Sequence, residues 1–224
     1  MTDQAYKYNP QIQKLHAVFN VQKSAFKQNM MPSYSQRIDL LNSLEQMLLN
    51  NQKSIVEAVE QDFGCHSEAL TKLVEIMPTV LRIRHTKAQL KKWMKAKSRS
   101  VNRTIFGFAK NKVIYQPVGV VGNIAPWNFP FDISLGPLSD ILAAGNRVII
   151  KPSELTPACS VLLERLVSET FAPEFVAVIS GGLDVSEAFA ELPWDHLIFT
   201  GGPEIGKKVM QSASKNLVPV TLEL

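Results

Sequence analysis

Roughly the first 100 residues carry hydrophobic side chains at helical spacing. Between Gln36 and Phe63 they form one apolar stripe, typical of a helix with a buried face, at Ile38, Leu41, Leu44, Leu48, Ile55, Val56 and Val59. Ser33 or Ser35 can cap the start of this helix. A second helical pattern runs from Glu68 to Lys97. Pro78 interrupts it and predicts a kink or a restart, because proline lacks the backbone N–H of a helix interior.

The pattern changes near Arg99. The stretch RSVNRTIFGFAKNKVIYQP, residues 99–117, mixes alternating apolar residues with turn residues. It predicts one or two extended strands. Because no partner strand is evident nearby, we expect these strands to form a projecting arm.

From Val118 onward, short apolar runs alternate with helical segments. Five β-branched runs predict buried strands at 118–124, 147–151, 175–180, 196–200 and 218–224. Helical patterns lie between them at 131–144, 156–171, 184–191 and 204–215. Single helices between buried strands imply right-handed crossovers and a parallel sheet. The expected fold is therefore α/β: a Rossmann-like, open, parallel five-stranded sheet whose ligands lie at the carboxyl ends of the strands.

This reading divides the chain into three regions. Residues 1–98 are expected to form a helical N-terminal segment of a cofactor domain, residues 99–117 the arm, and residues 118–224 the Rossmann-like nucleotide-binding region. The chain has 224 residues, enough to bury roughly 70% of its unfolded surface without disulfides or a structural metal.

Composition narrows the function classes. Hydrophobic residues make up 46% of the chain and charged residues 20%, and the net charge is only +4. The basic end of the second helix, from Lys87 to Arg103, therefore reads as a solvated face rather than a nucleic-acid stripe. Two cysteines exclude a disulfide framework, and no apolar run is long enough to span a membrane. We expect a cytoplasmic protein and no metal site.

Three of the predicted strand ends carry candidate chemistry. APWNFPF, residues 125–131, ends the first strand, and the carboxamide of Asn128 there can donate to a developing oxyanion, or simply satisfy its own turn. KPSELTP ends the second strand, where Lys151 and Glu154 can hold nucleotide ribose hydroxyls or form a plain surface ion pair. Glu223 ends the fifth strand and is either a general base or an acidic residue without a role.

FTGGPEIGKK, residues 199–208, ends the fourth strand and nearly matches a phosphate loop. Lys208 stands where that loop needs a hydroxyl for magnesium, and Glu204 places a negative charge in the cradle, so ATP hydrolysis is a poor reading. What remains is a Gly201–Gly202 turn followed by Pro203 at a helix start. Such a helix N-terminus suits a pyrophosphate, although the usual G-x-G-x-x-G is absent.

Together these motifs resemble the aldehyde dehydrogenase family. PWNFP at 126–130, KPSE at 151–154, FTGG with EIG at 199–206 and LEL at 222–224 occur in that family's order and spacing. LPWDHLIFTGG and NLVPVTLEL resemble most the coniferyl-aldehyde dehydrogenase branch. The resemblance covers essentially the whole chain.

The resemblance implies NAD-dependent oxidation of an aldehyde, of an aromatic or cinnamyl type such as coniferyl aldehyde, to the carboxylic acid. Asn128 would stabilise the oxyanion of a cysteine thiohemiacetal, hydride would pass to NAD rather than NADP, and Glu223 would activate the water that hydrolyses the thioester. The implied cofactor-binding residues are Ile124, Pro126, Trp127, Lys151, Ser153, Glu154, Gly181, Thr200, Gly201, Gly202, Ile205 and Leu224. The strands at 99–117 would belong to an arm used in a homodimer or tetramer.

The sequence departs from the family pattern at its end. The glycine pair that follows LEL and the nucleophilic cysteine beyond it are missing, and neither Cys65 nor Cys159 matches the position of that cysteine. We therefore expect a cofactor-binding half without a catalytic domain, inactive alone and at best a weak NAD binder. The alternative is a non-catalytic nucleotide-binding or oligomerisation module.

Overall fold

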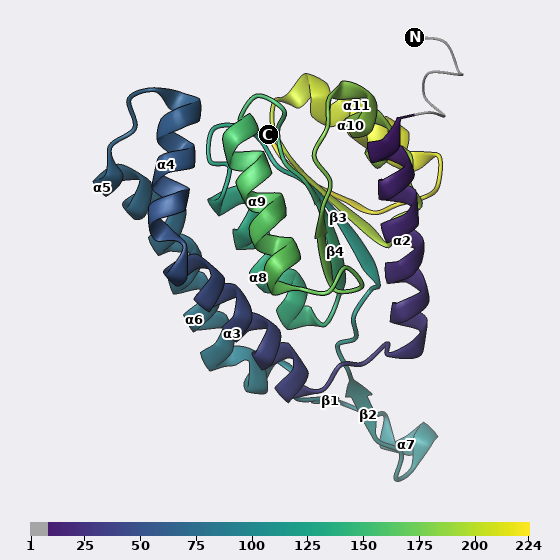
Figure 1. Cartoon of the computed structure of the whole chain (residues 1–224). Helices are drawn as coiled ribbons and strands as arrows, with labels where there is room; N and C mark the ends of the chain where they lie inside the picture. Colours follow the sequence, from purple (N-terminus) through teal and green to yellow (C-terminus); the bar gives the residue numbers. More distant parts are fainter. Residues whose placement is uncertain (1–8) are drawn as a thin grey trace.

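The computed structural model describes residues 9–224 (Figure 1). Two separate sheets are present in this part of the chain, one of five parallel strands and one of two antiparallel strands. The five-stranded sheet comprises β3 (Val120–Ile124), β4 (Arg147–Lys151), β5 (Val176–Val178), β6 (His196–Thr200) and β7 (Val220–Glu223). The helices between these strands are α8 (Asp132–Ala144), α9 (Pro157–Thr170), α10 (Leu183–Glu191) and α11 (Pro203–Ser214). The predicted α/β class and five-stranded parallel sheet are confirmed.

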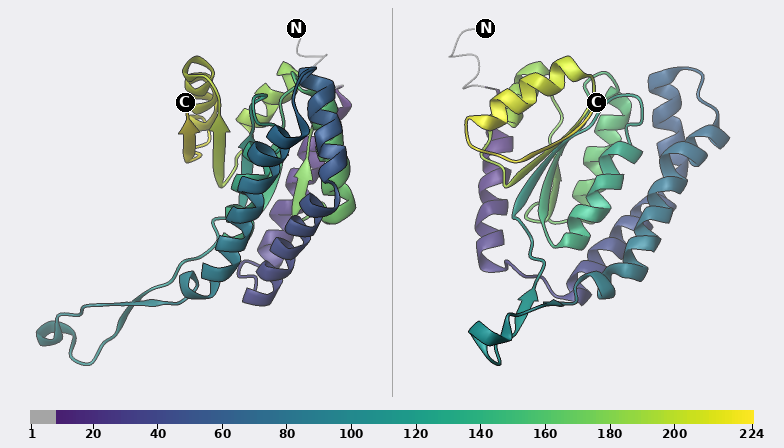
Figure 2. Two further views of the ribbon diagram at one scale, coloured as in Figure 1. Left: turned by 90° about the vertical axis from the view of Figure 1, so that its left-hand side faces the viewer. Right: turned by 180° about the vertical axis from the view of Figure 1, so that it is seen from behind.

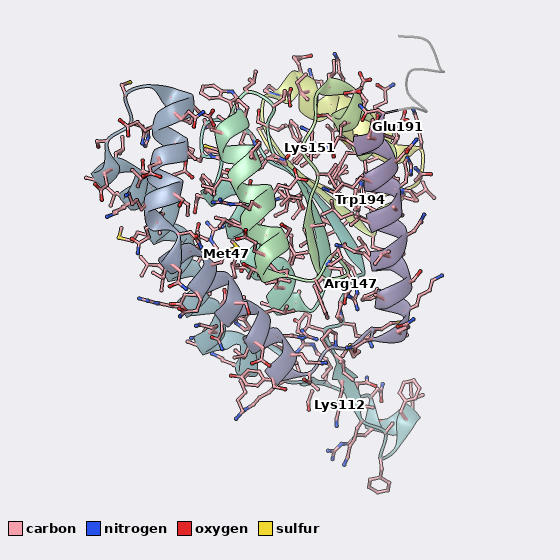
Figure 3. All side chains as sticks on the ribbon, in the orientation of Figure 1. Met47, Lys112, Arg147, Lys151, Glu191 and Trp194 are labelled. Atoms are coloured by element: carbon pink, nitrogen blue, oxygen red, sulfur yellow. The ribbon has the colours of Figure 1, made fainter. Side chains whose placement is uncertain are left out.

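The strand order is β5-β4-β3-β6-β7. From β3 the chain runs outward through β4 to β5, and then returns to place β6 on the other side of β3. A topological switch point therefore lies between β3 and β6, where open α/β sheets bind their ligands. Figure 3 shows the two ends of β4, Arg147 and Lys151, at opposite edges of the sheet.

Helices cover both faces of the sheet (Figure 2). Helices α8 and α9 pack on one face together with a further layer of N-terminal helices, while α2 (Pro10–Gln28), α10 and α11 pack on the other. Each face has its own apolar core: one centred on side chains such as Leu135 and Ile150, the other on side chains such as Phe189 and Trp194. Helix α2 was not singled out from the sequence, yet it carries four buried positions toward β3 and β4.

The N-terminal layer consists of more elements than the two predicted helices. They are α3 (Tyr34–Asn50), α4 (Gln52–Phe63), α5 (Glu68–Thr71), the π-helical turn η1 (Lys72–Ile76) and α6 (Met77–Trp93). The first predicted helix is split at Asn51, which leaves helical geometry for one residue while the apolar stripe continues on both sides. Ser33 provides the expected cap, with Gln36 completing a capping box. Pro78 lies in the first turn of α6, so the predicted restart is confirmed.

An arm projects from the body between α6 and β3 (Figure 2). Strands β1 (Lys97–Arg99) and β2 (Asn111–Val113) pair antiparallel, and the short helix α7 (Arg103–Phe106) lies between them. Near the tip, Phe108 is fully exposed. The arm begins two residues before the predicted boundary at 99, because Lys97 already pairs with Val113.

Candidate functional site

The carboxyl ends of the five parallel strands bring the predicted site residues to one edge of the sheet. Following the strand order, this edge carries Gly181 beyond β5, Lys151 at the end of β4, Trp127 beyond β3, Thr200 at the end of β6 and Glu223 at the end of β7. Segments far apart in the sequence therefore form a single row across the switch point.

Lys151 is the most buried charged group of this row, with an exposed fraction of 1%. Its ammonium donates to the carbonyl oxygen of Pro152 at 2.7 Å and to Oε2 of Glu154 at 3.2 Å. Burial lowers the pKa of Lys151, and the nearby Glu154 and Asp184 carboxylates partly offset that effect. The reading of a plain surface ion pair is wrong for Lys151, because only Glu154 reaches solvent. Ser153 Oγ accepts from Leu155 N in the same loop.

The turn after β3 presents Trp127 and Asn128 to solvent. Pro130 and Phe131 are buried beneath them, and the Trp127 ring lies 6.4 Å from that of Phe63 at the end of α4. Ile124 and Pro126 are half-buried at the start of the turn. The exposed carboxamide of Asn128 is free to face a ligand from outside.

Two carboxylates from the N-terminal layer hold the helices that follow these loops. Glu75 Oε2 accepts from Phe131 N at 3.1 Å and Asp132 N at 2.8 Å at the start of α8. Asp62 accepts from Ala158 N and Cys159 N at the start of α9. Neither helix has a side-chain cap at its own N-cap residue, so these remote carboxylates provide the missing acceptors.

These supporting residues were not found from the sequence. A signal existed for Glu75: Thr71, Glu75 and Thr79 recur at intervals of four on the buried side of the second helical stretch. Polar residues at such positions need a hydrogen-bonding partner. The sequence alone does not show that these positions are buried, because α8, which is far away in the sequence, packs against this layer.

The turn between β6 and α11 is open at Gly202, whereas Gly201 lies against the Phe199 ring. A Cβ at Gly202 would meet nothing within 4 Å, and no side chain in the described part of the chain caps the N-terminus of α11. Thr200 and Gly201 are half-buried at the strand end, whereas Ile205 is half exposed on the first turn of the helix. Lys207, which suggested a phosphate loop, is exposed and pairs with Glu204 at 2.7 Å.

Glu223 and Leu224 lie beside this turn. Thr200 Oγ1 donates to Glu223 Oε2 at 3.4 Å, and Gly201 N donates to the carbonyl oxygen of Glu223 at 3.0 Å. The side chain of Leu224 approaches Gly206 closely, since a Cβ there would lie 2.5 Å from Leu224 Cδ2. Gly206 therefore lies beneath the side chain of Leu224.

The two cysteines differ in accessibility, and Cys159 is unsuited to nucleophilic chemistry. Cys159 is buried in α9, and burial with the nearby Asp62 raises the pKa of its thiol well above the usual range. Cys65 is exposed just after α4. Among residues 9–224, no group of His, Cys, Asp and Glu side chains has the arrangement of a metal site. No helix in the described part of the chain has the length and apolarity that crossing a membrane requires.

The edge fits an elongated ligand that carries both hydroxyl and phosphate groups. Ser180 Oγ, beyond β5, is buried and has no hydrogen-bonding partner among residues 9–224, and it precedes the half-buried Gly181. The buried Lys151 adds a positive group, and the uncapped N-terminus of α11 adds backbone donors. This donor set is the one a dinucleotide needs across the switch point of a Rossmann sheet.

The comparisons agree with this geometry. The model of the aldehyde dehydrogenase family matches residues 8–224, so the chain belongs to the aldehyde dehydrogenase family. A probable coniferyl aldehyde dehydrogenase of Pseudomonas aeruginosa is 46% identical over 226 residues, which cover 100% of this chain and 47% of that protein. A coniferyl aldehyde dehydrogenase of a Pseudomonas species is 43% identical over 188 residues, which cover 84% of this chain and 38% of that protein.

Solved structures show the same fold. The substrate-bound state of AldH from Staphylococcus aureus superposes with a TM-score of 0.90 at 36% identity, covering 94% of this chain and 45% of that one. PnpE in complex with nicotinamide adenine dinucleotide superposes with a TM-score of 0.83 at 25% identity, and the match covers 95% of this chain and 43% of PnpE. The chain thus spans about half the length of the relatives that it matches.

Proposed function

We propose that this chain forms the NAD-binding half of an enzyme that oxidises an aldehyde to the carboxylic acid, with aromatic aldehydes of the coniferyl type as substrates. The observation that carries the proposal is the row of strand-end residues from Gly181 to Glu223, built on a sheet whose relatives are aldehyde dehydrogenases. NAD is favoured over NADP because Glu154 would repel a 2′-phosphate beside Lys151. The complete enzyme is proposed to act as a homodimer or tetramer in the cytoplasm.

Each residue of the row has a separate task in this proposal. Lys151 and Glu154 hold the adenine-side ribose, with Ser153 and Gly181 beside them. The Gly201–Gly202 turn, with Ile205, accommodates the pyrophosphate on α11. The nicotinamide side is lined by Ile124, Pro126, Trp127, Thr200 and Leu224. When bound, NAD supplies a hydride acceptor.

The two candidate catalytic residues act on the aldehyde carbon. Asn128 donates its side-chain N–H to the oxyanion that forms when a thiolate adds to the aldehyde and gives a thiohemiacetal. Loss of hydride from that carbon would leave a thioester, and Glu223 would then accept a proton from the water that hydrolyses the thioester to the acid and the free thiol. We assign the thiolate to a residue outside these 224, since Cys159 is buried in α9 and Cys65 follows helix α4 rather than a strand of the sheet.

A binding experiment tests this function. Calorimetric titration of the chain with NAD should show saturable, weak binding. Lys151→Met should weaken it by about tenfold or more, as expected for a lost hydrogen bond to a charged group. Lys207→Met is the matched control and should leave NAD affinity unchanged. Equal losses in both variants would contradict the proposed site. Reduction of NAD with coniferyl aldehyde by this chain alone would contradict the external thiolate.

A further inference from the structure

The turn that carries Asn128 is held from one side by a buried carboxylate on a different layer of the fold. Glu75 lies on η1 with an exposed fraction of 2%, and its carboxylate accepts hydrogen bonds from the backbone N–H groups of Phe131 and Asp132. Phe131 is the N-cap residue of α8 and lies three positions after Asn128. The residues between them include Pro130, which restricts the backbone, so a shift at Phe131 is transmitted to the turn.

The neighbouring side chain of Asp132 strengthens this connection. Thr79 Oγ1, one turn further along the N-terminal layer, donates to Asp132 Oδ1 at 2.6 Å. The N-terminal layer thus contacts the start of α8 through three hydrogen bonds. Across the sheet, Asn123 Nδ2 reaches the carbonyl oxygens of Ile133 and Ser134 only at 3.4 and 3.3 Å.

We infer that Glu75 is a positioning residue, which sets the orientation of the Asn128 carboxamide through the backbone of Phe131 and Asp132. This inference rests on the proposed oxyanion role of Asn128. A helix N-terminus capped by a carboxylate from its own sequence would move with that helix. Here the acceptor, Glu75, belongs to another layer, so the position of the turn is fixed relative to the N-terminal helices.

The charge of Glu75 makes the positioning sensitive to pH. Burial raises the pKa of Glu75 to about 7, with the Asp132 carboxylate adding to the rise, while the two backbone N–H bonds act in the opposite direction. Loss of the charge weakens both bonds, because a carboxylate accepts more strongly than a neutral carboxyl.

Other titratable and charged groups surround Glu75. Asp132 lies on α8, Asp62 on α4 and Cys159 on α9, whereas α5 contributes Glu68, which is paired with Lys72. From α6, the residue that reaches the cluster is the uncharged Thr79. Among residues 9–224, no ion pair includes Glu75. In the same layer, His66 Nδ1 hydrogen-bonds at 2.8 Å with Thr71 Oγ1, which lies one turn before Glu75.

Nuclear magnetic resonance of the NAD-free chain tests the inference directly. Between pH 5.5 and 8.5, the amide protons of Phe131 and Asp132 should titrate with one midpoint near neutrality. The side-chain amide of Asn128 should follow the same midpoint, which simple capping of α8 would not produce. Because no NAD is present, a failure of NAD binding leaves this readout unaffected and is recognised separately.

Three variants complete the experiment. Glu75→Gln should abolish the shared titration, whereas Asp62→Asn, which alters the equivalent cap on α9, and His66→Gln should preserve it. A titration that survives in Glu75→Gln would overturn the inference, as would an Asn128 side chain that stays constant while the Phe131 and Asp132 amides titrate. Should Glu75→Gln not fold, the wild-type titration of Asn128 alone decides between positioning and simple capping.

Discussion

The two halves of the strand-end row are built differently. On the side of β3 and β4, the loops lead into helices capped by Glu75 and Asp62, and the ammonium of Lys151 is buried among hydrogen-bond acceptors. On the side of β6 and β7, the loop glycine Gly202 is open, α11 has no side-chain cap, and Glu223 is exposed. The helices of the first half are capped by carboxylates of the N-terminal layer, whereas α11 has no such cap among residues 9–224.

This difference separates the proposed ribose and oxyanion contacts from the proposed pyrophosphate turn and general base. The tertiary contacts hold the loops proposed to contact the ribose and the oxyanion, so these loops can adopt their geometry within this chain. The exposed half carries the proposed general base, whose carboxylate accepts from Thr200 Oγ1 at 3.4 Å and from no other described residue. We expect the first half to be pre-organised and the second to depend on further contacts.

The largest expected effect concerns the core beneath the first half. Phe131→Ala removes a side chain with no exposed surface and should lower the free energy of unfolding by about 3–5 kcal/mol. Phe129→Ala, in the same turn but 39% exposed, should cost less than about 1 kcal/mol. Urea denaturation measures both. Similar losses would show that the turn is not anchored by burial.

The next effect is the pH dependence of stability that Glu75 introduces. Its folded pKa of about 7 lies above the unfolded value of 4.5, so its stabilising contribution is complete below pH 4.5 and is lost as the pH rises through 7. Relative to Glu75→Gln, the wild type should lose up to about 3 kcal/mol between pH 4.5 and 8. Urea denaturation at both pH values measures this, and parallel curves would contradict the assignment.

The smallest effect compares two glycines. A Cβ at Gly122 in β3 would lie 2.8 Å from each of Leu197, Phe189 and Trp194, so Gly122→Ala should cost about 1–3 kcal/mol. Gly206→Ala in α11 meets mainly the half-exposed Leu224, which can rotate away. It should raise the free energy of unfolding by about 0.5–1 kcal/mol through helix propensity. Thermal unfolding of the two variants shows whether each change raises or lowers the free energy of unfolding. A destabilised Gly206→Ala would show that the β6 and β7 side is also closely packed.

The five-stranded sheet and its crossover helices, residues 118–224, could be predicted from the sequence because their signals are local. Short β-branched runs and single helices between them marked every strand of the sheet, and the boundaries differ by only a few residues. The split at Asn51 could not be seen, since Leu48 and Ile55 preserve the helical stripe across it. The order of the strands in the sheet depends on tertiary contacts, so no local sequence pattern predicts it.

The candidate site was predictable only as far as its motifs reach. Residues such as Lys151 and Glu154 belong to short contiguous motifs, and the parallel sheet brings them to one edge. Glu75 and Asp62 belong to no motif, because their partners are backbone N–H groups of any residue type. Burial of Lys151 was equally invisible, since a lysine at a strand end is usually solvated.

The two remote caps also affect the order in which the fold can form. The bonds of Glu75 and Asp62 join residues that are 56 or more positions apart, so each requires the closure of a long loop. Contacts of such separation form late relative to local turns. We therefore expect the loops bearing Asn128 and Glu154 to reach their final geometry only when the N-terminal layer docks. This half of the site would then be completed in the same cooperative step that completes the fold.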